Sequence, residues 1–153
     1  MKINNWEDLI ALAKKQGLTP KEAWERIEKT NLKFLNRKSV AEKELRKAIP
    51  KSWNHELIKL YAKLDAPDLA TLSKRVDRWL VDRPRDANLW LAASQLAKRD
   101  ELWTQAKQFL ERSIDNKETA LAYNELGLIL LALGQEDEAI KTFNKALDLN
   151  KNQ

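Results

Sequence analysis

Apolar residues recur three or four positions apart along most of the chain, which is the spacing of one face of an α-helix. The first such stripe consists of Trp6, Leu9, Ile10 and Ala13. It predicts a short helix that ends at Gly17. Two capping-box patterns follow, each a Thr or Ser with Glu three residues later, at 19–22 and 39–42. The second predicts a helix that ends near Ile49-Pro50, because proline disfavours helical geometry in the residue before it.

From residue 53 onward the stripes come in pairs that predict helical hairpins. With the helices before residue 53 counted as the first pair, the second pair runs from Trp53 to Pro84, and "DAPD" at 65–68 lies between its two helices. The third covers about 87–114 and breaks near Asp100, and the fourth covers about 118–149 and breaks at Gly134. The uncharged run at 126–134 is too short to span a bilayer, and its Leu and Ala content favours a helix over a strand.

The last two hairpins match each other at a spacing of 33 residues. The matched pairs are Trp90 with Tyr123, Ala106 with Ala139, and Leu110 with Phe143. A period this close to 34 residues, with an aromatic early in one helix and a small residue early in the next, resembles the tetratricopeptide repeat. In the fourth hairpin the family's consensus positions are held by Tyr123, Leu126, Gly127, Gly134, Ala139, Phe143 and Ala146. Leu130 and Lys151 depart from the consensus, as do Ala93 and Ser94 in the third hairpin.

This resemblance implies an all-α fold, a right-handed α-solenoid of helical hairpins. We expect one domain, 1–153, with N-terminal helices at 1–50, a degenerate repeat at 53–86, and repeats at 87–119 and 120–153. Gly127 and Ala139 are expected to face each other where the two helices of the last hairpin cross closely.

Composition and charge exclude several classes of function. The chain has no Cys, which rules out disulfides and thiolate metal sites, and a single His, His55, which rules out a paired-His site. The net charge of +5 is dispersed, with a basic front end and an acidic last third, and no nucleic-acid motif accompanies it. His55 fits either a surface residue or an axial haem ligand. The six Trp residues favour core packing, with Trp103 as a candidate exposed contact.

Four stretches resemble the C-terminal region of HemY-type proteins. They are "LIKLYAKL", "RWLVDRP", "QLAKRDELWTQAKQFLERS" and "AYNELGLILLALG". HemY-type proteins are bacterial inner-membrane proteins associated with late protohaem synthesis, with N-terminal membrane helices followed by tetratricopeptide repeats. The resemblance implies a soluble repeat portion of an inner-membrane-anchored protein, held at the membrane only through a segment not present in this chain; otherwise we expect a cytoplasmic protein.

The predicted function is recognition without catalysis. We expect a protein partner, a haem-synthesis enzyme or else a porphyrin, on the concave face of the stacked hairpins, with no resident cofactor or metal and no nucleic acid. The alternative is a generic tetratricopeptide scaffold unrelated to haem, and an enzyme is the third hypothesis. The oligomeric state stays open. Helix geometry places the partner surface at Asn88, Leu91, Gln95, Lys98, Arg99, Leu121, Asn124 and Leu128.

Overall fold

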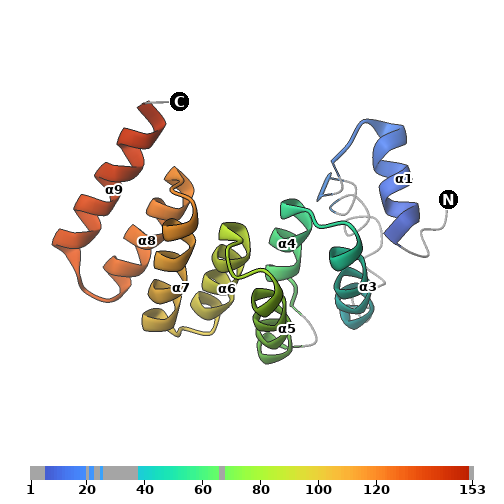
Figure 1. Ribbon diagram of the computed structural model, residues 1–153, viewed down its shortest axis with the longest axis horizontal. Helices are drawn as coiled ribbons and strands as arrows, with labels where there is room; N and C mark the ends of the chain where they lie inside the picture. Colours follow the sequence, from blue (N-terminus) through green and yellow to red (C-terminus); the bar gives the residue numbers. More distant parts are fainter. Residues whose placement is uncertain (1–5, 20, 23–24, 26–37, 66–67, 152–153) are drawn as a thin grey trace. The chain divides into compact units, whose positions relative to one another are not determined.

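The computed structural model describes residues 6–19, 21–22, 25, 38–65 and 68–151. Within these ranges the chain forms eight helices and no strand, which confirms the all-α prediction (Figure 1). The helices are α1 (Trp6–Gln16), α3 (Lys38–Lys51), α4 (His55–Ala62), α5 (Leu69–Asp82), α6 (Ala87–Arg99), α7 (Trp103–Asn116), α8 (Ala120–Ala132) and α9 (Glu136–Lys151). They belong to two compact units, Met1–Asp68 and Leu69–Gln153.

In the first unit, the local signals around residue 17 act as predicted. α1 ends at Gln16, the following Gly17 has a φ of 65°, and the Leu18 amide donates to the Ala13 carbonyl at 2.8 Å. The positive φ explains why glycine stands there. Thr19 and Glu22 then form the predicted capping box, because each backbone amide donates to the side-chain oxygen of the other, at 3.0 and 3.2 Å.

The second capping-box prediction is wrong. Ser39 lies inside α3 rather than before it, and Glu42 is 3% exposed. The Glu42 carboxylate accepts a hydrogen bond of 2.6 Å from the hydroxyl of Tyr61 on α4, and the Arg46 Nε lies 3.9 Å away. A buried carboxylate needs such partners, since its desolvation is otherwise uncompensated. Glu42 therefore joins α3 to α4.

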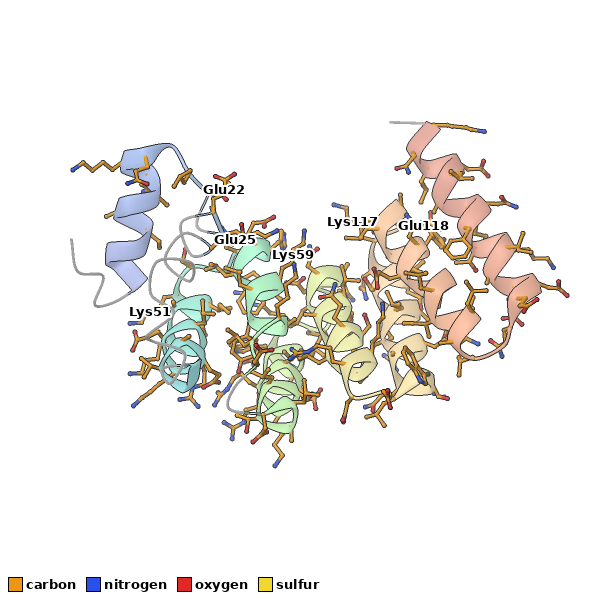
Figure 2. The ribbon with its side chains drawn as sticks, turned by 180° about the vertical axis from the view of Figure 1, so that it is seen from behind. Glu22, Glu25, Lys51, Lys59, Lys117 and Glu118 are labelled. Carbon is orange, nitrogen blue, oxygen red and sulfur yellow. The ribbon has the colours of Figure 1, made fainter. Side chains whose placement is uncertain are left out.

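In the second unit, the two complete hairpins repeat their local geometry as well as their sequence. Asp86 caps α6 by accepting from the Leu89 amide at 3.1 Å, and Thr119 caps α8 by accepting from the Ala122 amide at 3.1 Å. Lys117 and Glu118 lie in the connection between α7 and α8 (Figure 2). The hairpins predicted at 87–114 and 118–149 are confirmed.

The core of the second unit lies between these hairpins. Its buried members come from α6 to α9 and are Leu91, Ala97, Ala106, Leu110, Ala122, Leu126, Ile129, Leu130 and Ala139. Ala106 and Ala139 are both 0% exposed. A Cβ added to Gly127 would meet the ring of Phe143, with Cζ only 2.6 Å away. The close approach predicted at Gly127 is therefore real, but the residue nearest to it is Phe143 rather than Ala139.

The boundary between the two units falls inside the predicted degenerate repeat 53–86. α4 belongs to the first unit and α5 to the second. Each helix buries the apolar residues expected of it, including Leu57 and Tyr61 on α4 and Val76 and Trp79 on α5. The pairing of α4 with α5 as one repeat, and the single domain 1–153, stay predictions.

Candidate functional site

The predicted partner surface falls on two helices of the second unit. On α8, Leu121, Asn124 and Leu128 are exposed along one side of the helix. Leu121 and Leu128 are each 46% exposed. Leu131, also 46% exposed, continues the same side one turn further on. Its spacing of three residues from Leu128 was a signal that the sequence prediction did not use.

On α6 the corresponding side is largely covered. Asn88, Gln95 and Lys98 are half-buried and Arg99 is exposed, but Leu91 is 5% exposed and belongs to the core. Leu91 belongs to the core cluster that also includes residues of α7, α8 and α9, so its side chain is not open to a partner. The structure therefore removes Leu91 from the candidate surface and leaves the other seven residues at its edge or within it.

An ion pair links the two helices. The Lys98 Nζ lies 3.5 Å from the Glu125 Oε2, and the two side chains are 37% and 22% exposed. A half-exposed pair of this kind contributes about 0–1 kcal/mol to stability, so its main effect is to fix where the Lys98 ammonium lies. Lys98 already has an acidic partner, which limits its use as a contact for another protein.

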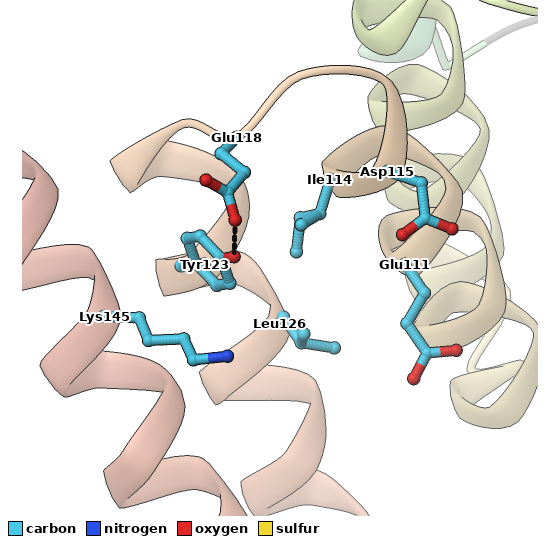
Figure 3. A pocket seen from close by; sticks show the side chains of 7 residues that line it. All are labelled: Glu111, Ile114, Asp115, Glu118, Tyr123, Leu126 and Lys145. Carbon is cyan, nitrogen blue, oxygen red and sulfur yellow. Dashed lines mark hydrogen bonds between the residues drawn. The ribbon is translucent and has the colours of Figure 1, made fainter.

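A second concave feature lies between α7 and the last hairpin and was missed by sequence reasoning. It is a hollow of about 460 Å³. It is lined by Glu111, Ile114, Asp115, Glu118, Tyr123, Leu126 and Lys145 (Figure 3). Its carboxylates come from α7 and from the connection that follows, whereas the ammonium comes from α9. Only the fold brings these charges together, because Glu111 and Lys145 are distant in sequence.

Tyr123 organises one wall of this hollow. Its hydroxyl donates to the Glu118 Oε1 at 2.6 Å, and the Lys145 Nζ lies 5.7 Å from the centre of its ring. The hydrogen bond to Glu118, together with burial and the negative charges of Glu118 and Asp115, raises the pKa of Tyr123 to about 12. Tyr123 is therefore a neutral hydrogen-bond donor throughout the physiological range and pins the start of α8 to the preceding connection.

A smaller hollow of about 120 Å³ lies where α5 meets the α6/α7 hairpin. Asp77, Asp100 and Phe109 are among the residues that line it, and burial raises the pKa of the Asp77 carboxyl. Neither hollow brings together a nucleophile, a base and an oxyanion donor, the arrangement that hydrolytic or transfer chemistry requires.

The remaining candidate residues have structural positions. His55 begins α4 and is exposed, which agrees with the surface interpretation rather than with ligation inside a pocket. Trp103 is half-buried and packs against the core, and Trp79 is 7% exposed. The side chains of Trp6 and Trp24 lie outside the described residues. In the part of the chain that the structure describes, no cluster of His, Asp or Glu could hold a metal ion.

A comparison with known protein families agrees with this geometry. Residues 120–153 match the family model of the tetratricopeptide repeat, which is the stretch where the consensus positions were found. No curated protein matches the amino-acid sequence.

Among the described helices, none has both the length and the apolar composition needed to cross a membrane.

Similar folds occur among solved structures. The crystal structure of MamA is 15% identical, with a TM-score of 0.65, and the match covers 99% of this chain and 98% of that one. A second MamA structure is 17% identical with a TM-score of 0.63, covering 95% and 90% of the two chains. MamA 41-end from Desulfovibrio magneticus RS-1 is 14% identical with a TM-score of 0.64, covering 97% and 94%. These likenesses show a shared helical fold and do not support the resemblance to HemY-type proteins.

Proposed function

We propose that the second unit is a non-catalytic scaffold that binds a protein partner along α8 and the adjoining edge of α6. The observation that carries the proposal is the exposure of Leu121 and Leu128, at 46% each, on either side of the exposed amide of Asn124. Apolar side chains with a polar group between them provide both buried area and direction for a bound segment.

The match of residues 120–153 to the tetratricopeptide repeat supports this proposal, because the exposed leucines lie on the first helix of that repeat. Helical repeats stack their first helices along one surface, which suits an extended or helical segment of a partner. We expect the bound segment to present apolar side chains to Leu121 and Leu128, with Gln95 and Asn124 available for hydrogen bonds at the margin.

The haem-related partner implied by HemY-type proteins remains a prediction from resemblance alone. An exposed face of a single helix, α8, favours a peptide segment over a flat porphyrin, because a porphyrin would need a deeper apolar pocket and an axial ligand. The scaffold function without a haem connection, first considered as the alternative, is therefore the one we propose. Location at the inner membrane also remains a prediction.

A capture experiment with matched variants tests the proposal. Leu121→Glu combined with Leu128→Glu should remove specific protein capture from a native lysate by at least about tenfold, since two apolar contacts are lost. Val81→Glu on α5 is the control, because Val81 is 80% exposed and lies on another helix. Both proteins should keep the wild-type melting temperature.

Equal capture by the wild type and the double variant would place the functional surface elsewhere. The charge reversal Lys98→Glu is a poor probe, because it would set a second carboxylate beside Glu125. A titration with protoporphyrin, followed by its absorbance, tests the haem alternative in parallel. Saturable binding that Leu121→Glu/Leu128→Glu abolishes would favour a porphyrin over a peptide.

A further inference from the structure

The outer face of α9 exposes two large apolar side chains. Ile140 is 58% exposed and Leu147 is 56% exposed. Together with three exposed polar residues they form one stripe along the helix, because the five positions are spaced by four, four, three and four residues. This α9 stripe consists of Glu136, Ile140, Asn144, Leu147 and Lys151.

The equivalent face of α7, in the preceding hairpin, is partly covered by neighbouring residues. The residues 33 positions before Ile140 and Leu147 are Lys107 and Ile114 on α7. Ile114 packs against the core that α7 shares with α8, and the Lys107 Nζ lies 3.5 Å from the Oε1 of Gln135 in the next hairpin. On α9 the two large apolar residues of this face, Ile140 and Leu147, are instead exposed.

We propose that the α9 stripe is the contact between two copies of this chain, which pair with their α9 helices antiparallel. A twofold axis near Asn144 sets Ile140 of each copy against Leu147 of the other. The stripe thereby continues the helix-on-helix packing that joins the two hairpins within one copy.

Charge complementarity along the α9 stripe favours a second copy of this chain as the partner, and an antiparallel orientation of the two helices. α9 carries Glu136, Asp137 and Glu138 in its first turn and Lys151 in its last. Antiparallel pairing about Asn144 sets Glu136 against Lys151 of the second copy at both ends, whereas parallel pairing would set like charges together. Within one helix the two residues are about 22 Å apart and cannot pair. Because one helix pair is a small contact, we expect a dissociation constant in the micromolar range.

Sedimentation equilibrium on the full chain tests the pairing directly. Between about 1 and 200 μM the weight-average mass should rise from 17.8 kDa toward twice that value. Ile140→Glu combined with Leu147→Glu should weaken association at least about 100-fold, because four apolar side chains per dimer are replaced by carboxylates. Val81→Glu should associate like the wild type. Circular dichroism melts confirm that each variant is folded.

Charge exchange distinguishes the antiparallel pair from other dimers. Glu136→Lys alone, or Lys151→Glu alone, should weaken association about tenfold, since each change places like charges together at both ends of the interface. The double variant Glu136→Lys/Lys151→Glu should restore the wild-type value. Restoration requires that the two positions meet between copies, because they cannot meet within one helix.

A cross-link locates the twofold axis. The chain has no Cys, so Asn144→Cys introduces a single thiol, which a short bis-maleimide should couple into a dimer. Lys141→Cys, off the stripe on the same helix, should couple poorly. A wild-type chain that stays monomeric at 200 μM would overturn the proposal and leave the face to another protein or a further hairpin. An Ile140→Glu/Leu147→Glu variant that still dimerises would overturn it as well.

Discussion

The hairpins α6/α7 and α8/α9 are two solutions to the same packing problem. Each sets an aromatic residue near the start of its first helix and holds a cation over that ring. In the earlier hairpin the Arg112 Cζ lies 5.4 Å from the ring centre of Trp90, and in the later one the Lys145 Nζ lies 5.7 Å from that of Tyr123. Both pairs are separated by 22 residues, so the period of 33 preserves the interaction even where all four residues differ.

The hairpins differ in how they use the polar end of that aromatic residue. The Trp90 Nε1 donates to the Pro84 backbone carbonyl at 2.8 Å, whereas the Tyr123 hydroxyl donates to the Glu118 carboxylate at 2.6 Å. Both bonds fasten the connection before the helix, but only the second involves titratable groups. The two hairpins thus share the position of this hydrogen bond but not the residue types that make it.

They also differ at the helix crossing. The position that Gly127 holds in α8 is held by Ser94 in α6, whose hydroxyl donates to the Leu91 carbonyl at 2.6 Å. The position of Phe143 in α9 is held by Leu110 in α7. Gly127 and Phe143 in the later hairpin thus correspond to Ser94 and Leu110 in the earlier one. The smaller residue at the first position goes with the larger residue at the second, so the summed volume of the two positions is similar.

The largest effect should come from overfilling the crossing in either hairpin. Ala139→Trp and Ala106→Trp should each lower the free energy of unfolding by about 3 kcal/mol or more, because both sites are 0% exposed and an indole cannot fit without moving the helices. Chemical denaturation measures the loss. Val81→Trp on the exposed side of α5 is the control, because Val81 is 80% exposed, and equal denaturation midpoints for all three variants would contradict the packing.

The exchange of volume between the hairpins can be tested by a double-mutant cycle. Gly127→Ala should cost about 1–2 kcal/mol, because overlap with the Phe143 ring outweighs the better helix propensity of Ala. In a Phe143→Leu background, which copies the earlier hairpin, the same change should cost at least about 1 kcal/mol less. Additive losses in the denaturation midpoints would show that the two residues do not share this space.

The turns of the two hairpins differ in a way that predicts a stabilising change. Glu101 has a φ of 58° and Gly134 a φ of 76°, at equivalent positions. A residue with a Cβ is strained there by roughly 1 kcal/mol. Glu101→Gly should therefore raise the free energy of unfolding by about 0.5–1 kcal/mol, and Gly134→Ala should lower it by about 1 kcal/mol. Shifts of the same sign in the two thermal melts would refute this account.

The hydrogen bond between Tyr123 and Glu118 makes the stability of the later hairpin depend on pH. The pKa of Tyr123 is about 12 in the folded chain against 10.0 ordinarily, so the neutral form is favoured. The resulting stabilisation is complete below pH 10 and is lost as the pH rises from 10 to 12. Glu118→Gln should lower the Tyr123 pKa, because it removes the negative charge of Glu118 and leaves a weaker, neutral acceptor for the hydroxyl. Absorbance at 295 nm follows the titration, with Tyr123→Phe identifying the signal; an unchanged midpoint would contradict the assignment.

The sequence by itself determined the features that depend on near neighbours. Helix positions, the capping box at Thr19 and Glu22 and the turn at Gly134 follow from residues within a few turns of one another, and the period of 33 follows from comparing two such segments. Such signals act through local backbone geometry and short-range hydrogen bonds, so they can be recognised without knowing the fold. The exposure of Leu121 and Leu128 followed from the same periodicity.

Only the tertiary structure decided which faces are covered. Leu91 and Leu128 carry similar signals in sequence, but Leu91 lies in the core at 5% exposed, whereas Leu128 is 46% exposed. Glu42 has the pattern of a capping residue, yet the Tyr61 hydroxyl on another helix holds it in the interior. The hollow at Tyr123 joins carboxylates from one hairpin to a lysine of the next. Burial and charge pairing depend on distances between segments that are remote along the chain, and those distances are set by packing rather than by periodicity.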